Sequence, residues 1–209
     1  MAQTGNLYVI AAPSGTGKTS LVKAITDSIP NLAVSISHTT RAMRPEEQDG
    51  INYFFIDKPT FTQMIDRGEF LEHADVFEHC YGTSKPWVEE MIHRGIDVIL
   101  EIDWQGHQQI KKLFPGSIGI FLLPPSLKDL RERLLKRNQD ALITIEKRLK
   151  DVRETVSHVD DFEYLVMNDD FNQAVHDLTT IIDAGRLLTT AQRRKYTGLI
   201  TDLSEIAAS

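Results

Sequence analysis

A glycine-rich segment near the N-terminus carries the clearest chemistry in the sequence. It follows the apolar run 7–12 and opens the stretch 18–29, whose apolar residues have helical spacing. Glycines let backbone N–H groups turn around phosphate oxygens, and the N-terminus of the helix adds unpaired N–H donors. Lys18 then reaches the β- and γ-phosphates, and the Thr19 hydroxyl can bind Mg²⁺. The sequence therefore predicts an ATP-binding phosphate loop of Ala12, Pro13, Ser14, Gly15, Thr16, Gly17, Lys18 and Thr19, with Ala12 where the usual motif has glycine.

The phosphate loop alone does not identify a reaction, because several classes of protein share it. Asp103-Trp-Gln-Gly106 fits the D-x-x-G pattern of a GTPase switch. A GTPase should also carry an Asn-Lys-x-Asp guanine reader near the end of a late strand. The nearest candidate, Asn168-Asp-Asp170, lacks the lysine, so the motifs disfavour a GTPase.

Further motifs resemble, in the same order along the chain, those of guanylate kinases. They are Ser37-His-Thr-Thr-Arg41, Arg44-Pro45, Gly50-x-x-Tyr53, Phe70-Leu-Glu72, Tyr81-Gly82-Thr83, Glu101-Ile-Asp103-Trp-Gln-Gly106, the three arginines Arg133, Arg137 and Arg148, and Asn168-Asp169-Asp170. The resemblance runs from about Leu7 to Arg186, and its motifs are unrelated to one another, which makes it specific. It implies a Mg²⁺-dependent transfer of the γ-phosphoryl group of ATP to GMP, giving ADP and GDP in purine nucleotide metabolism.

The motifs between residues 37 and 103 supply the groups that GMP requires. Arginine forks and hydroxyls hold a dianionic phosphate best. The N1–H and N2–H₂ donors of guanine need carboxylate acceptors, which the edge of adenine would not satisfy. The expected phosphate ligands are Arg41, Arg44, Tyr53 and Tyr81. The expected guanine ligands are Glu72 and Asp103, with Ser37 and Thr83 as donors to O6 or N7.

The resemblance assigns Arg133, Arg137 and Arg148 to a mobile lid over ATP. Residues 126–153 hold nine of the 23 Lys and Arg and only five acids, so this segment is about +4 in a chain of net charge −7. Cations beside the transferring phosphoryl group lower the barrier. The expected catalytic residues are Lys18, Arg41, Arg133, Arg137 and Arg148. The usual family pattern has glycine after Arg137, where this chain has Asn138.

Two further side-chain roles are expected at the ATP end of the site. Asn168 is a candidate for an adenine contact. Glu101 and Asp103, two apart on a predicted strand, point the same way and would orient waters on the magnesium ion. Position 101 is usually Asp in the family, so the longer Glu101 departs from its pattern.

Four apolar runs predict the strands of an α/β fold with a mainly parallel sheet flanked by helices. These runs are 7–12, 97–103, 117–123 and 164–167. Segments 1–36, 90–125 and 154–209 are expected to form the core of a single domain, 1–209. Residues 37–89 are expected to form a GMP-binding insert with a small antiparallel sheet that includes Asn52–Ile56, and residues 126–153 a helical lid.

Composition and charge indicate the class of the protein, the partners that it disfavours and its cellular location. The chain has 41% hydrophobic and 25% charged residues, as globular proteins do, and its charge of −7 disfavours broad binding to nucleic acid or anionic membranes. Cys80 is the single cysteine, so no internal disulfide can form. The apolar run after Asn6 is too short for a signal sequence or a membrane span, and a cytoplasmic location is expected.

Several questions stay open at the level of sequence. A non-catalytic guanylate-kinase-like module that binds proteins is the main alternative, but such modules have typically lost loop or lid residues that this chain keeps. A kinase for AMP or a pyrimidine nucleotide is disfavoured by Glu72 and Asp103. No residue visibly reads the sugar 2′-hydroxyl, so the sequence does not decide whether dGMP is a substrate. The helical stretch Arg186–Ser209 could dock on the core or on another subunit as a homo-oligomer.

Overall fold

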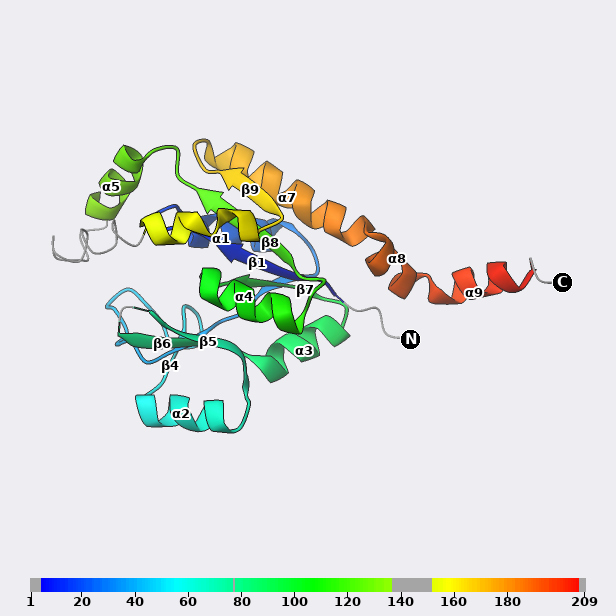
Figure 1. Cartoon of the computed structure of the whole chain (residues 1–209), viewed down its shortest axis with the longest axis horizontal. Helices are drawn as coiled ribbons and strands as arrows, with labels where there is room; N and C mark the ends of the chain where they lie inside the picture. The colour runs from blue at the N-terminus through cyan, green and yellow to red at the C-terminus, as the bar shows by residue number, and fades with distance from the viewer. Residues whose placement is uncertain (1–4, 77, 137–151, 207–209) are drawn as a thin grey trace.

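The central element of the fold is a five-stranded parallel sheet (Figure 1). A computed structural model describes residues 5–76, 78–136 and 152–206. The strands lie in the order β2-β7-β1-β8-β9 and pair in parallel throughout. They are β1 (Leu7–Ala11), β2 (Leu32–Val34), β7 (Asp97–Glu101), β8 (Ile118–Leu123) and β9 (Tyr164–Met167). Because the strands are parallel, their carboxyl ends meet at one edge, where ligands bind in open α/β sheets.

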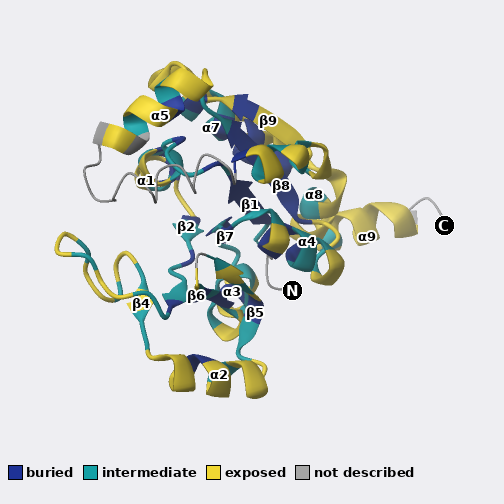
Figure 2. Cartoon of the chain, turned by 60° about the vertical axis from the view of Figure 1, so that its left-hand side comes forward, coloured by how far each residue is buried: buried dark blue, intermediate teal, exposed yellow. Residues whose placement is uncertain are grey.

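Helices cover both faces of this sheet, because successive strand residues point to opposite sides. On one face, Ile10 of β1 packs with residues of α1 (Lys18–Ser28) and α7 (Phe171–Leu187). On the other face, Val9 packs with residues of α3 (Lys85–His93) and α4 (Trp104–Leu113). Figure 2 shows the strands as the most buried part of the molecule. Burial on both faces therefore explains the apolar runs of β1, β7 and β8, whereas the edge strand β9 buries only Val166.

A second, smaller sheet lies beside the carboxyl edge of the first and has the order β4-β3-β6-β5. Its elements are β3 (His38–Thr39), β4 (Phe54–Phe55), β5 (Phe70–Val76) and β6 (His79–Ser84), with α2 (Lys58–Asp66) between β4 and β5. Strands β5 and β6 form an antiparallel hairpin.

The expected antiparallel strand at Asn52–Ile56 is wrong in direction and length. Only Phe54–Phe55 is a strand, and it pairs in parallel with β3. The connection 40–53 is long enough to return the chain to the beginning of β3, which a parallel pairing requires. The small sheet is therefore mixed.

The remaining elements are the first helix of the basic segment, a short turn before β9 and the C-terminal helices. Helix α5 (Leu127–Lys136) begins the basic segment, and the 3₁₀ turn η1 (Val159–Asp161) precedes β9. After α7, helices α8 (Thr189–Lys195) and α9 (Thr197–Ile206) project away from the sheet as an arm (Figure 1).

The predicted α/β class with a parallel, helix-flanked sheet is confirmed. All four predicted runs contain strands, and β9 has the predicted bounds. The fifth strand, Leu32–Val34, was not predicted, because three residues are too few to show a pattern. Within the described ranges, no helix combines the length and apolar character needed to cross a membrane.

Candidate active site

The phosphate loop connects β1 to α1 in a conformation that only glycine adopts easily. Gly15 has φ 91° and Gly17 has φ 99°, both in the left-handed region. Thr16 is buried and closes the turn by donating its backbone N–H and its hydroxyl to the Pro13 carbonyl, at 3.2 and 2.8 Å. Gly17 is the N-cap of α1 and has no side-chain cap, so the first N–H groups of the helix are free to meet an anion.

Strand pairing brings carboxylates to this loop. Ile10 of β1 lies opposite Glu101 of β7, so both strands end together. The Thr19 hydroxyl donates to Glu101 Oε2 at 3.0 Å, and Lys18 Nζ donates to the Ile102 carbonyl at 3.3 Å. Burial lowers the pKa of the Lys18 ammonium, while the negative charges of Glu101 and Asp103 raise it. The predicted loop lysine, loop hydroxyl and metal-facing carboxylate therefore lie together.

Asn168 and Arg133 support the loop from the opposite side. Asn168 follows β9, is buried, and donates Nδ2 to the Thr16 carbonyl at 2.6 Å. Arg133 of α5 donates Nη1 to the same carbonyl at 3.0 Å and Nη2 to the Asn168 carbonyl at 3.2 Å. A β-carbon on Gly17 would lie 2.7 Å from Asn168 Nδ2, so the loop and Asn168 fit closely. Arg133, which the sequence predicts as a lid residue, therefore contacts the phosphate loop directly.

A buried carboxylate lies in the hairpin of the small sheet. Glu72 of β5 is paired across the strands with Thr83 of β6 and is only 4% exposed. The Thr83 hydroxyl donates to Glu72 Oε1 at 2.5 Å. Burial raises the pKa of the Glu72 carboxyl to about 7, and Asp103 adds to this rise, whereas the hydrogen bond from Thr83 opposes it. The ionised form of this buried carboxyl offers only acceptors, so a ligand edge that carries donors would stabilise it.

Asp103 joins this carboxylate to the main sheet. It caps α4, accepting the Gly106 N–H on Oδ1 at 2.9 Å. Gly106 also lies close to Glu72, because a β-carbon there would lie 2.8 Å from Glu72 Oε2. The two predicted guanine acceptors thus lie on either side of one glycine. Their negative charges reinforce each other, which favours a ligand edge that carries donors.

The predicted phosphate ligands form a second group in the small sheet. Arg41 stacks near the Tyr53 ring, at 5.5 Å from its centroid, and the Tyr53 and Tyr81 rings meet edge to face at 5.8 Å. Burial raises the pKa of Tyr53 to about 12, so its hydroxyl stays a donor at neutral pH. Arg41 and the two phenols therefore form one cluster.

Glu47 holds the arginines in place, a role that the sequence did not reveal. Its Oε1 forms an ion pair with Arg41 Nη2 at 2.7 Å, and its Oε2 accepts the Arg44 backbone N–H at 2.9 Å. The Arg44 guanidinium lies 3.9 Å from Glu47. Glu47 lies among other charged residues in the sequence, so only its spatial contacts distinguish it.

For the other predicted site residues, the structure gives a position in the chain but few contacts that bear on ligand binding. Ser37 is half-buried next to β3, and its carbonyl accepts the Phe54 N–H. Ala12, Pro13 and Ser14 lie in the loop after β1. Two predicted lid residues, Arg137 and Arg148, and the departure at Asn138 lie outside the described residues.

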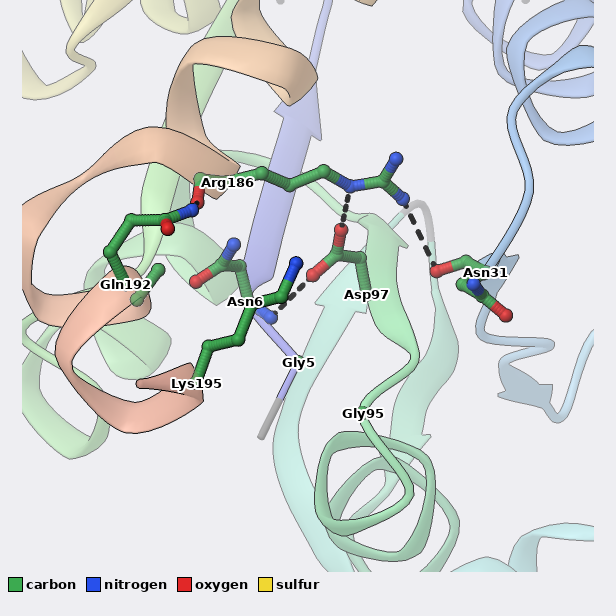
Figure 3. Close-up of a pocket in the computed structure, with 9 residues that line it drawn as sticks. Gly5, Asn6, Asn31, Gly95, Asp97, Arg186, Gln192 and Lys195 are labelled. Atoms are coloured by element: carbon green, nitrogen blue, oxygen red, sulfur yellow. Dashed lines mark hydrogen bonds and ion pairs between the residues drawn. The ribbon is translucent and has the colours of Figure 1, made fainter. Parts of the chain in front are cut away.

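A polar cavity of about 220 Å³ lies at the other end of the sheet (Figure 3). It is lined by Asn6, Asp97, Arg186 and Lys195, among others. Arg186 Nε pairs with Asp97 Oδ2 at 2.7 Å, and Asp97 Oδ1 accepts the Asn6 N–H at 2.6 Å. These contacts fix α7 to the beginning of β1 and β7 and pair the charges of Asp97 and Arg186 with each other. The cavity is therefore structural and separate from the candidate site.

Comparisons with known proteins agree with this arrangement. The guanylate kinase family model matches residues 4–185. The chain is 52% identical to a guanylate kinase of Coxiella burnetii over 200 residues, covering 96% of this chain and 97% of the relative. It is 50% identical to a guanylate kinase of Alcanivorax borkumensis over 203 residues, covering 97% and 98%. Its fold is similar to the crystal structure of guanylate kinase from Anaplasma phagocytophilum, with a TM-score of 0.72, 29% identity and coverage of 90% and 89%.

Proposed function

The chain belongs to the guanylate kinase family, and we propose that it transfers the γ-phosphoryl group of ATP to GMP, giving ADP and GDP, through the residues described above. The observation that carries the assignment of the site is the pair of carboxylates at Gly106. Glu72 is buried, bonded to Thr83 and next to Asp103, at the same edge of the sheet as the phosphate loop. That arrangement suits guanine, which offers two adjacent donors.

On the GMP side, we assign the base to Glu72 and Asp103, with Ser37 and Thr83 as donors to O6 or N7. The phosphate is assigned to the cluster of Arg41, Arg44, Tyr53 and Tyr81. Glu47 keeps Arg41 in place before GMP binds, and the dianionic phosphate then shares that cation. An AMP molecule would leave the buried carboxylates unpaired, which costs about 1–3 kcal/mol for each lost partner. Specificity for guanine follows from that penalty.

On the ATP side, the backbone of residues 12–19 and Lys18 hold the phosphates. Lys18 moves from the Ile102 carbonyl, where it lies at 3.3 Å, to the phosphate oxygens. Arg133, with Arg137 and Arg148 assigned from the sequence alone, brings positive charge to the transferring group. Positioning and charge are sufficient for phosphoryl transfer, so the assignment includes no general base.

The residues at the loop also suit magnesium. Thr19 Oγ1 and Glu101 Oε2 lie 3.0 Å apart at the end of β7, and oxygen ligands of this kind are those that Mg²⁺ prefers. Thr19 would bind the ion directly, while Glu101 and Asp103 would orient its waters. When bound, the ion supplies positive charge next to the ATP phosphates. Removal of Mg²⁺ with a chelator should therefore stop turnover without preventing GMP from binding.

The experiment that tests the function is ADP production from Mg·ATP with GMP, AMP, UMP and CMP, each supplied separately. We expect turnover with GMP and little with the others. Lys18→Ala should nearly abolish turnover and spare GMP affinity, whereas Glu72→Ala should mainly raise the KM for GMP. Equal loss of GMP affinity in both variants would contradict this division of roles. GMP binding without turnover of any monophosphate would instead favour a protein-binding module.

A further inference from the structure

The two carboxylates assigned to guanine come from different sheets. Asp103 follows β7 of the main sheet and caps α4, whereas Glu72 lies on β5 of the small sheet. Helix α4 packs against β5, so it lies where the two sheets meet (Figure 1). The spacing of the two carboxylates therefore depends on where β5 lies along α4.

Strand β5 presents an unpaired edge next to Glu72. It is the last strand in the order of the small sheet, so one side of it has no strand partner among the described residues. Its register with β6 shifts between Phe70 and Glu72, an irregularity of the kind that redirects side chains. Leu71 and Glu72 are both buried although they are consecutive, which a regular strand with one covered face would not allow. The edge beside Glu72 is therefore open to another element.

Gln109 of α4 binds this edge with both ends of its amide. Its Oε1 accepts the His73 N–H at 3.3 Å, and its Nε2 donates to the His73 carbonyl at 2.9 Å. A primary amide has one acceptor and one donor side, so it matches the backbone groups of a single residue. Gln109 is three residues after Gly106, on the same face of the helix, and Gly106 lies against Glu72. One face of α4 therefore makes room for the Glu72 carboxylate and binds the residue that follows it.

We propose that Gln109 is a positioning residue for the guanine base, an inference that rests on the proposed function. Its amide fixes the position of β5 along α4 and so holds Glu72 at the spacing from Asp103 that two adjacent donors of one base require. Two hydrogen bonds to the same residue resist sliding of the strand along the helix, which an apolar contact would not. Gln109 acts through Glu72 and is assigned no contact with the nucleotide.

The first test compares steady-state kinetics of two neighbouring variants. Gln109→Met keeps the length of the side chain and removes both hydrogen bonds, so the KM for GMP should rise about three- to tenfold. The KM for ATP should stay within about twofold of the wild type. Gln108→Met is the matched control, since Gln108 donates to Asp161 Oδ2 at 3.2 Å, away from β5, and it should leave both KM values within about twofold. Equal rises in the KM for GMP in both variants, or equal rises in the two KM values of Gln109→Met, would overturn the inference.

A second variant tests the direction of the hydrogen bonds. Gln109→Glu keeps an acceptor for the His73 N–H but turns a second acceptor toward the His73 carbonyl. The KM for GMP should rise at least as much as in Gln109→Met, because two acceptors then face each other. A Gln109→Glu chain with the KM of the wild type would show that the amide does not hold the strand.

A double variant separates positioning of Glu72 from a general loosening of the fold. In Glu72→Ala the carboxylate that Gln109 positions is absent, so adding Gln109→Met should raise the KM for GMP by less than about twofold further. An undiminished three- to tenfold rise in that background would overturn the inference, because Gln109 would then act on something other than Glu72. A wild type that fails to bind GMP in a calorimetric titration would overturn both the inference and the proposed function. A wild type that binds GMP, with Gln109 variants that behave like Gln108→Met, would overturn the inference alone.

Discussion

Gly106 leaves the space that the Glu72 carboxylate occupies. A β-carbon at position 106 would lie 2.8 Å from Glu72 Oε2, closer than real β-carbons approach such an atom. The Gly106 N–H meanwhile donates to Asp103 Oδ1. A residue with no side chain therefore sits between the two carboxylates assigned to guanine and sets how closely they approach.

Gly106→Ala should raise the KM for GMP by about tenfold or more, because displacing Glu72 removes at least one charge-assisted hydrogen bond to the base. The KM for ATP should change less than the KM for GMP, since the β-carbon would meet Glu72 Oε2 at 2.8 Å and the Ile102 side chain at 3.0 Å rather than the phosphate loop itself. Steady-state kinetics with each substrate varied checks this. Gly198→Ala is the control, because a β-carbon there would meet nothing within 4 Å.

A second change should offset the first. Glu72→Asp shortens the carboxylate and makes room for the new methyl group. In the double variant the rise in KM should fall clearly short of the product of the two single effects. A simple product, or an equal rise in the KM for ATP, would mean that Gly106 acts on folding rather than on Glu72.

GMP affinity should depend on pH through Glu72. Its pKa of about 7 means that the carboxylate is mostly protonated at pH 6 and mostly ionised at pH 8. Guanine needs the ionised form, so the Kd for GMP should be about tenfold weaker at pH 6 than at pH 8. Calorimetric titration measures this, and Glu72→Gln provides the baseline for titration of the GMP phosphate itself. A wild type as flat with pH as that variant would show that the carboxylate does not titrate in this range.

The same carboxylate should destabilise the protein without ligand. Folding raises its pKa from 4.5 to about 7. The free energy of unfolding therefore falls as the pH rises from about 4.5 to 7, and the loss is complete above 7. The shift corresponds to about 3 kcal/mol. Glu72→Gln should therefore gain stability relative to the wild type at pH 8 but not at pH 4.5, as measured by urea unfolding. A gain of equal size at both pH values would refute the linkage.

The sequence predicts the fold well where its signals are local. Burial on both faces produces the continuous apolar runs of β1, β7 and β8, and the short apolar run of the edge strand β9 places a fourth strand of the five, although only its Val166 is buried. The direction of Phe54–Phe55 could not be predicted, because it depends on how the connection 40–53 returns the chain to β3. A parallel pairing of two residues leaves no pattern in the sequence.

In the candidate site too, residues with a local sequence signal were predicted, and residues that act through long-range contacts were not. Residue types and spacing indicate Lys18, Glu72 and Asp103, because each belongs to a motif with its own chemistry. Glu47 and Gly106 were missed as contributors, although Gly106 closes a recognised motif. Glu47 acts through contacts with Arg41 and Arg44 that only the folded chain reveals, and Gly106 acts through the absence of a side chain next to Glu72. Roles of this kind depend on distances between segments far apart in sequence.

Asn168 provides the last prediction, because it separates support of the loop from contact with the base. Its amide donates to the Thr16 carbonyl at 2.6 Å, and both residues are buried. Asn168→Asp would place a second acceptor against that carbonyl, which costs about 1–3 kcal/mol. The KM for ATP should rise by about ten- to a hundredfold, while the Kd for GMP should stay within about twofold. Asp169→Asn is the control, since Asp169 is exposed and its Oδ1 can still accept the Asp170 N–H. If Asn168→Asp bound ATP normally but used GTP more readily than the wild type, Asn168 would read the base, and its bond to Thr16 would be incidental to catalysis.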